Sequence, residues 1–223
     1  LDSGESGVPL GILPLGRGND LAGSLGYPRG WRRALAALDG GRAAPLDVGR
    51  ARLDGRECLF VNALGLGFDA DVARRARRLR LPGPAAYVAG VAGAVAAAPG
   101  PWRLRGTVDG EPVDREVTLL SLGNGPTTGG GFRMTPDADP ADGFLDACWA
   151  AAAPRRSILL MLPRVALGRH GSDPRITLSR CRRLDLQAEP PIPGHADGEV
   201  LPPARRIEVQ LLPAALRVIR PVA

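Results

Sequence analysis

Lysine is absent from this 223-residue chain, so all 29 of its basic side chains are arginines. A phosphate loop of the Walker type is therefore excluded, because its lysine is the residue that reaches the phosphates. Aromatic residues make up only 4% of the chain, and without a ladder of stacking side chains nucleic-acid binding is not expected. No segment reaches the roughly 18 apolar residues that span a bilayer, since the longest candidate, Ala85–Ala98, is shorter and interrupted by glycines.

Cysteine and histidine are scarce as well. The three cysteines, Cys58, Cys148 and Cys181, lack close metal-ligand spacing, and the two histidines are too few for a histidine-rich metal site. An odd cysteine count favours a reduced protein, so we expect a cytoplasmic location. The segment Leu1–Pro9 shows no signal peptide and no initiator methionine, and we expect the chain to begin partway into a longer protein.

Asparagine occurs only at positions 19, 62 and 124, each time beside glycines in a predicted loop. In a chain so poor in asparagine, this placement indicates either functional loops or only the left-handed turn geometry that asparagine tolerates.

Arginine, alanine, glycine and proline are abundant instead. The formal net charge is +6, which suits an anionic partner such as a nucleotide or an acidic membrane surface. The same composition is typical of a GC-rich genome, which enriches arginine for reasons unrelated to function. Five arginines crowd one predicted helix, as either a solvated face or a patch that faces phosphates or a membrane: Arg74, Arg75, Arg77, Arg78 and Arg80.

The stretch Gly11–Gly26, GILPLGRGNDLAGSLG, is predicted to run from a strand through a glycine turn into a helix. Gly11–Leu15 is a short apolar run, Asn19 and Asp20 are capping residues, and the helix begins at Leu21. Backbone N–H groups and the helix dipole then converge on one point, where anions bind. An ordinary strand-to-helix connection with an Asx cap is the alternative.

Farther along, short strands alternate with Asp-Gly turns, which predicts a β-sandwich or barrel with inserted helices. The pairs Asp54-Gly55 and Asp109-Gly110 are each expected to close a hairpin. The predicted helices are Trp31–Leu38, Ala70–Arg80, Ala85–Ala98 and Pro154–Leu167, and the predicted strands are Pro45–Leu53, Glu57–Asn62, Arg103–Val108, Val113–Leu122, Phe144–Ala151, Arg175–Ser179, Arg183–Ala188, Arg206–Leu212 and Leu216–Ile219.

Two acidic turns are candidates for chemistry. In the first, Asp139 and Asp142 with nearby backbone carbonyls make an oxygen site suited to Mg²⁺ or Ca²⁺; a solvated turn is the alternative, and spacing alone favours it. In the second, Asp197 and Glu199 flank a glycine and can present both carboxylates at one loop tip. Such a pair would take a proton from a hydroxyl and hold a nucleotide-bound metal. A plain Asp-Gly hairpin turn is the alternative.

Four motifs follow one another in the chain: LPLGRGNDLAGSLG, FVNALGLGFDADV, LGNGPTTGGGFRMTPDADPADGFLD, and HADGE followed by LRVIRP. In this order they resemble the diacylglycerol kinase catalytic-domain family, in particular the soluble bacterial lipid kinases related to sphingosine kinases. They are similar to that family's P-x-G-T-x-N-D-(F/L)-A, N-x-x-G-x-G-x-D-A-x-V, N-G-x-x-x-G-G-G-x-x-x-x-P-x-A-x-x-x-D-G-x-L-D and terminal D-G-E segments. The resemblance covers nearly the whole chain.

The resemblance implies an α+β fold, with the remnant of an N-terminal α/β nucleotide-binding domain followed by a β-sandwich domain with inserted helices, and ATP in the cleft between them. The implied ranges are 1–44 for the first part, 45–212 for the sandwich and 213–223 for a closing segment that returns toward the first domain. The implied nucleotide-binding residues are Gly16, Arg17, Gly18, Asn19 and Asp20; the implied catalytic residues are Asp197, as general base, and its neighbour Glu199; and the implied Mg²⁺ ligands are Asp139, Asp142 and the Phe144 carbonyl.

The implied function is an ATP-dependent lipid kinase that phosphorylates the hydroxyl of diacylglycerol or a related lipid at a membrane surface, with ATP as substrate and Mg²⁺ bound. We expect a cytoplasmic protein that associates peripherally with membranes and does not bind nucleic acid. The sequence leaves open whether it forms a homodimer. The family's G-G-D-G-T phosphate loop would precede Gly11, and Arg17 replaces the family's threonine, so we expect no turnover by residues 1–223 alone. A non-catalytic lipid-binding or interaction module of the same fold is the alternative.

Overall fold

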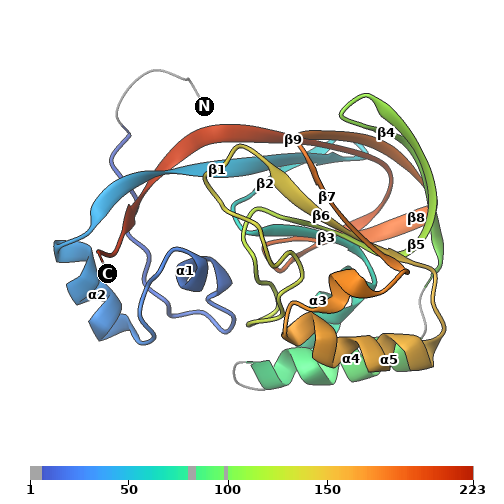
Figure 1. Ribbon diagram of the computed structural model, residues 1–223, viewed down its shortest axis with the longest axis horizontal. Helices are drawn as coiled ribbons and strands as arrows, with labels where there is room; N and C mark the ends of the chain where they lie inside the picture. The colour runs from blue at the N-terminus through green and yellow to red at the C-terminus, as the bar shows by residue number, and fades with distance from the viewer. Residues whose placement is uncertain (1–6, 80–83, 98–99, 223) are drawn as a thin grey trace.

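The computed structural model describes residues 7–79, 84–97 and 100–222. Its strands form one large curved sheet, with helices below that sheet and at one end (Figure 1). The helices are α1 (Asp20–Ser24), α2 (Trp31–Asp39), α3 (Phe68–Arg78), α4 (Pro84–Ala97) and α5 (Arg155–Ala166), followed by a 3₁₀ turn at His170–Ser172. The strands are β1 (Arg42–Leu53), β2 (Arg56–Phe60), β3 (Ala63–Gly67), β4 (Trp102–Val108), β5 (Glu111–Gly123), β6 (Leu145–Ala151), β7 (Ile176–Cys181), β8 (Arg183–Ala196) and β9 (Glu199–Arg220).

The strands are antiparallel and lie in the order β2-β1-β9-β8-β3-β5-β6-β7. Strand β4 pairs with one end of β5 and one end of β8, while β3 pairs with the opposite ends of the same two strands. Because β5 and β8 are bridged at both ends, the sheet closes around an apolar core. The expected sandwich with inserted helices is therefore confirmed. Its fully buried leucines and isoleucines include Leu64, Leu66, Leu104, Leu120, Leu122, Leu145, Leu184, Leu186, Ile192 and Ile207.

Both predicted Asp-Gly hairpins form. Asp54-Gly55 joins β1 to β2, and Asp109-Gly110 joins β4 to β5. In each pair the aspartate and the glycine both have positive φ, which is the turn geometry that matches the twist of a two-residue hairpin. Asp197-Gly198 has the same geometry and joins β8 to β9, so the plain hairpin alternative for this turn describes its backbone correctly.

A second, smaller core lies at the other end of β1 and β9. Ala22 of α1, Leu25 directly after it and Ala34 of α2 pack there against Leu46 of β1 and Val218 of β9. Tyr27 ties this region together, because its hydroxyl accepts a hydrogen bond from the Ile12 N–H and donates one to the Ile219 carbonyl. No observation tests the domain boundaries 1–44, 45–212 and 213–223, which stay a prediction.

The strand predicted at Gly11–Leu15 is wrong. Of this region only Leu10 pairs, in a parallel bridge to Val218, with hydrogen bonds of 2.9 Å from the Leu10 N–H to the Arg217 carbonyl and from the Ile219 N–H to the Leu10 carbonyl. Within the described ranges no further strand runs beside residues 11–15. An apolar run without a partner for its backbone groups stays extended but does not form a ladder.

The two final strands predicted at Arg206–Leu212 and Leu216–Ile219 are parts of one long strand, β9. Proline and alanine at positions 213–215 suggested a break. The structure instead absorbs them as a bulge, where Ala214 has a φ of 50° and its N–H donates to Asp47 Oδ1 at 2.6 Å. A shift of the β1–β9 register at Leu46/Val48 marks the same place.

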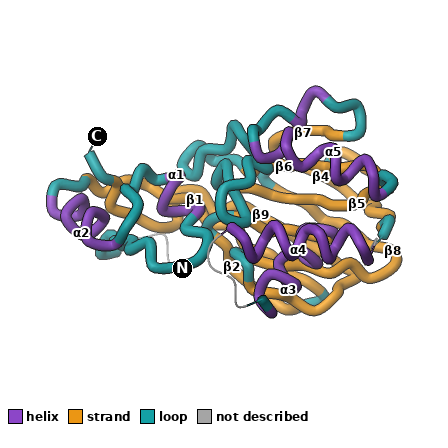
Figure 2. The backbone as a smooth tube through the Cα atoms, turned by 90° about the horizontal axis from the view of Figure 1, so that it is seen from below, coloured by secondary structure: helices purple, strands orange, loops and turns teal. Residues whose placement is uncertain are grey.

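Helices α3, α4 and α5 cover one face of the sheet, as the view from below shows (Figure 2). All three were predicted, with first residues that differ by one to two positions. The predicted end residues Arg80 and Ala98 of the first two helices lie outside the described residues. Phe68 and Val72 of α3 and Val91 and Val95 of α4 pack on Leu119 of β5. Among the described residues, no helix is long and apolar enough to cross a bilayer.

Gly49 of β1 allows a close approach that any larger residue would prevent. A Cβ at this position would lie 2.0 Å from the ring of Phe60, which is 1% exposed. We expect Gly49→Ala to lower the free energy of unfolding by about 1–3 kcal/mol through overpacking. Gly23→Ala is the matched control, since nothing lies within 4 Å of its Cβ. Urea denaturation of both variants checks this, and an equal effect would contradict it.

Candidate functional site

The carboxylate of Asp197 holds two parts of the chain together. Its Oδ2 accepts a hydrogen bond from the Val61 N–H at 2.8 Å, and its Oδ1 accepts from the Asn62 and Ala63 N–H groups at 3.0 and 2.8 Å. The aspartate sits on the β8–β9 turn and the donors on the β2–β3 connection. The pKa of Asp197 is raised, because the surrounding protein shields the carboxylate, and the three donors oppose this shift. The residue as a whole is nonetheless exposed to solvent.

His195 and Asp69 support this turn from below. The Gly198 N–H donates to His195 Nδ1 at 3.2 Å, which places the ring proton on Nε2. Nε2 lies 3.3 Å from Asp69 Oδ2 on α3, and both atoms are buried without another partner. Gly65 leaves the space for this contact, because a Cβ there would lie 2.3 Å from each atom. Sequence reasoning missed this pair, although the LGLGFD run signalled a close backbone approach.

The loop Gly16–Asp20 is closed by its own asparagine. Asn19 has a φ of 58° and bonds through its side-chain amide to the Gly16 N–H and to the Gly16 carbonyl, both at 2.8 Å. Asn19 stands at the N-cap position of α1, as predicted, but its side chain makes no cap hydrogen bond there, because the loop itself engages it. Asp20 reaches away from the helix as well, and its Oδ2 accepts a hydrogen bond from the Gly130 N–H at 2.8 Å.

The predicted nucleotide loop and the predicted catalytic pair face the same cleft. The cleft has two adjoining parts of about 350 and 360 Å³, which share Arg17, Gly18, Tyr87, Asp197 and Gly198 in their walls. All five loop residues line the second part, and Glu199 lines the first.

Two arginines reach the cleft from opposite sides. The Arg17 side chain spans it and donates from Nη1 to the Leu79 carbonyl, at the end of α3, at 3.1 Å. Arg77 of α3 forms an ion pair with Glu199, whose side chain is 76% exposed. Of the two predicted catalytic carboxylates, therefore, Asp197 is held by backbone groups and Glu199 by an exposed arginine. This difference leaves Asp197 as the better-positioned of the two.

An apolar chamber adjoins this cleft. It has a volume of about 100 Å³ and lies between the sheet and helices α3, α4 and α5; Tyr87 of α4 lines both the chamber and the cleft. Burial raises the pKa of the Tyr87 hydroxyl, and the nearby carboxylates of Asp69 and Asp20 raise it further. Sequence reasoning missed the chamber, because its walls come from elements far apart in the chain. The apolar residues that line the chamber include Phe68, Val91, Phe132, Met134, Ile158, Met161, Leu162 and Val165.

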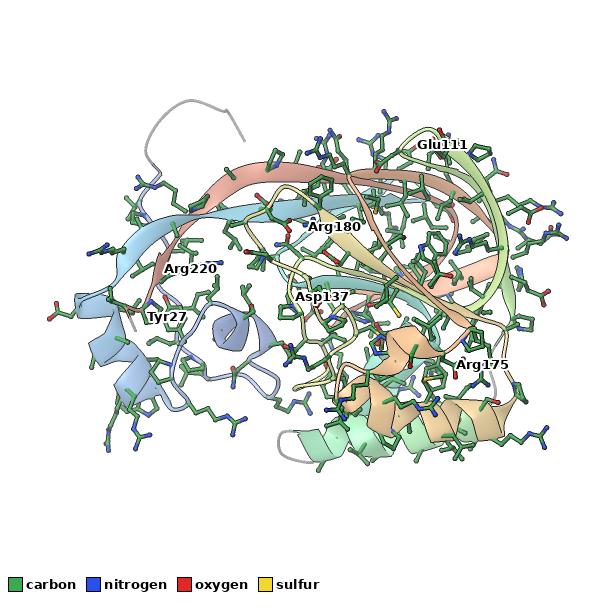
Figure 3. All side chains as sticks on the ribbon, in the orientation of Figure 1. Tyr27, Glu111, Asp137, Arg175, Arg180 and Arg220 are labelled. Carbon is green, nitrogen blue, oxygen red and sulfur yellow. The ribbon has the colours of Figure 1, made fainter. Side chains whose placement is uncertain are left out.

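The three predicted Mg²⁺ ligands are not assembled as a metal site. Asp142 forms an ion pair with Arg180 and accepts a hydrogen bond from the Phe144 N–H at 3.0 Å, while Asp139 lies 3.8 Å from Arg220. Figure 3 labels the two arginines and Asp137, which belongs to this acidic turn. In the part of the chain that the structure describes, no group of three or more acidic, histidine or cysteine side chains is arranged to hold a metal. The donor set as placed does not fit Mg²⁺, and Mg²⁺ binding here stays a prediction.

The amino-acid sequence matches the models of two known protein domains. Residues 1–51 match the diacylglycerol kinase catalytic domain, and residues 62–220 match the YegS C-terminal NAD kinase beta sandwich-like domain. The chain is 35% identical over 219 residues to a diacylglycerol kinase of Mycobacterium tuberculosis, a match that covers 96% of this chain and 70% of that protein.

The chain belongs to the diacylglycerol kinase family of lipid kinases. A second family member, from Pseudomonas aeruginosa and named "Probable lipid kinase YegS-like", is 31% identical over 226 residues, covering 99% of this chain and 71% of that protein. A crystal structure of a diacylglycerol kinase from Bacillus anthracis shares the fold, with a TM-score of 0.68 and 19% identity over 95% of this chain and 66% of that one. The recognised family is thus confirmed, and the roles of individual site residues stay predictions.

The contact between His195 and Asp69 should appear as energetic coupling. We expect His195→Leu and Asp69→Leu each to lower the free energy of unfolding by about 1–3 kcal/mol, because each leaves a buried polar partner alone. The double variant, in which both polar groups are gone, should be less destabilised than the sum of the two by about 0.5–3 kcal/mol. Urea denaturation of the four proteins gives the cycle, and strict additivity would show that the two side chains do not interact.

Proposed function

We propose that this protein transfers the γ-phosphoryl group of ATP to the hydroxyl of diacylglycerol or a related lipid. Family membership supports a lipid kinase. The observation that carries the proposal further is the placement of Asp197, which lines a polar cleft at the point where Tyr87 separates that cleft from an apolar chamber. The phosphates of the donor would contact the cleft on one side of this carboxylate, and the apolar part of the acceptor would contact the chamber on the other side.

ATP, delivered as its Mg²⁺ complex, would bind along the Gly16–Asp20 loop. The glycines keep side chains out of the way, so the phosphates can approach the backbone closely. Arg17 adds a charged fork with five N–H donors, of which one is used by the Leu79 carbonyl. Its guanidinium is suited to hold a phosphate oxygen, in a position where the family has a threonine hydroxyl.

Asp197 would accept the proton of the lipid hydroxyl. As that proton leaves, the hydroxyl oxygen forms a bond to the γ-phosphorus, the bond between this phosphorus and the β–γ bridging oxygen breaks, and ADP departs. Its shielded position, which raises the pKa of Asp197, makes the carboxylate a stronger base than an ordinary aspartate. The three N–H donors fix the orientation of the carboxylate, and its one remaining lone pair is available to the substrate.

The acyl part of the acceptor would enter the apolar chamber. Phe68, Val91 and Leu162 contribute to a wall with little polar surface, and an apolar wall of this kind stabilises a hydrocarbon chain by roughly 25 cal/mol for each Å² removed from water. The alternative function, lipid binding without transfer, uses the same chamber. Phosphoryl transfer would require the Asp197 carboxylate, whereas lipid binding alone would not.

Replacement of Asp197 tests the role of the general base. In the protein expressed from its complete gene, Asp197→Asn should lower kcat by about 10²–10⁴-fold, because a positioned base contributes that much. Asp109→Asn is the matched control: Asp109 also sits on an Asp-Gly turn and accepts hydrogen bonds from backbone N–H groups of Arg182 and Arg183, away from the cleft.

The pH dependence provides a second readout. Because the base must be deprotonated and the pKa of Asp197 is raised, the rate should fall on acidification at a higher pH than an ordinary aspartate would give. Phosphorylation of lipid at a near wild-type rate by Asp197→Asn would refute the assignment. Lipid binding without phosphorylation by the wild-type protein would favour the alternative function.

Replacement of Arg17 tests the phosphate contact. We expect Arg17→Thr to weaken ATP binding by about 10- to 100-fold, which corresponds to the loss of one hydrogen bond between charged groups. Arg32→Thr serves as the control, since Arg32 lies over the Trp31 ring on α2, outside the cleft walls. Titration calorimetry with ATP measures both. A gain in affinity for Arg17→Thr would mean that the arginine obstructs the site.

A further inference from the structure

Acidic residues are missing from the part of the chain that builds the helical face. Residues 72–108 and 147–172 contain no aspartate or glutamate, although the chain has 23, and they contain 11 arginines. Six of these arginines form ion pairs with carboxylates that lie outside the two segments: Arg74, Arg75, Arg77, Arg103, Arg105 and Arg164. These segments include most of α3 and all of α4 and α5. Helix α4 carries no charged residue at all. The two carboxylates of α3, Asp69 and Asp71, are buried, so they add little negative charge to this face.

Large apolar side chains lie exposed on the same face. Leu160 of α5 is 74% exposed and Leu159 is 49% exposed, while Val88 of α4 is 59% exposed and Leu167, next to the end of α5, is 64% exposed. Figures 1 and 2 show α4 and α5 side by side below the sheet, with no other described element over them. The exposed positions of α4 are otherwise alanines, such as Ala85, Ala92 and Ala96.

The buried side of α5 is apolar too. Ile158, Met161, Leu162 and Val165 point into the chamber described above, and Leu159 and Leu160 point to solvent. A helix that is apolar on both sides is suited to surroundings that are apolar on both sides. Exposed arginines stand at its ends: Arg156 in the first turn and Arg169 beyond the last. Arg164 is paired with Asp173.

We propose that the α4–α5 face docks on an anionic lipid bilayer, with Leu160 and Leu167 in the boundary between headgroups and acyl chains. Charge complementarity selects this partner, because three arginines of this face, Arg78, Arg156 and Arg169, are exposed and form no ion pair with the described residues. Each attracts anionic headgroups by about 1 kcal/mol when it lies near the membrane. The docked face also places the chamber directly above the bilayer, so that an acyl chain passes between α4 and α5 without crossing water. This route rests on the proposed lipid kinase function; the docking itself does not.

Sedimentation with vesicles tests the surface. The protein expressed from its complete gene is mixed with vesicles of phosphatidylcholine and phosphatidylglycerol, or of phosphatidylcholine alone. We expect binding to the anionic vesicles only, and at least a tenfold loss of that binding for Leu160→Glu, since burial of one leucine is worth roughly 1.5–3 kcal/mol. Leu59→Glu is the matched control, because Leu59 is 50% exposed on β2, away from the helical face. It should bind as the wild type does.

Three results would overturn the proposal: no binding by the wild type, equal binding by Leu160→Glu, or an equal loss for Leu59→Glu. A wild-type dimer that Leu160→Glu converts to a monomer would instead make this face a contact between two copies.

A kinase assay separates the proposal from the function on which its lipid route rests. Leu160→Glu should phosphorylate a dispersed short-chain diacylglycerol like the wild type and a long-chain diacylglycerol in anionic vesicles at least tenfold more slowly. A wild type that phosphorylates neither acceptor refutes the kinase function, while sedimentation still decides the docking.

Discussion

The site depends on one carboxylate that is bonded to three consecutive backbone N–H groups. Asp197 holds the β2–β3 connection against the β8–β9 turn, and the Asp197 N–H adds a further hydrogen bond to the Ala63 carbonyl. The same connection then places Asn62 and Asn124. The Asn124 amide donates to the Val61 and Asp47 carbonyls, and the Asn62 amide donates to the Thr127 carbonyl. One acidic side chain thus fixes the backbone geometry on this side of the cleft.

Placing a charge at this position has a cost that the backbone offsets only in part. Shielding from water disfavours the ionised form, and the pKa of Asp197 is raised in spite of three donors. An aspartate selected for stability alone would be better solvated or fully paired. Asp54 and Asp109 close the other two turns of this geometry and also accept hydrogen bonds from backbone N–H groups. At Asp54 the N–H groups of Arg206 and Arg205 outweigh the effect of burial, and the pKa of Asp54 is lowered. The same turn therefore gives opposite acidity, according to where it lies.

Local signals in the sequence predicted the local structure well. Asp-Gly pairs fix both φ values of a hairpin turn, and the helices near α3, α4 and α5 follow from breaks at proline and glycine, so their existence did not depend on the rest of the fold. The prediction at Gly11–Leu15 was wrong because an apolar run does not specify a partner. The bulge at Ala214 was missed because its stabilising contact, Asp47, lies 167 residues away. The cofactor loop and Asp197 were matched through motif order, whereas the His195–Asp69 contact and the apolar chamber arise from packing between distant elements.

Strands β1 and β9 run through both cores, with paired residues from Arg42 and Arg220 at one end to Leu53 and Ile207 at the other. Any hinge between the two cores would have to open this ladder or bend it at the Ala214 bulge. Rigid-body closure, the usual way in which two-domain enzymes enclose a substrate, is therefore restrained on this side of the cleft. Adjustment to a ligand falls to the parts outside the ladder, the Gly16–Asp20 loop and helix α4 with Tyr87.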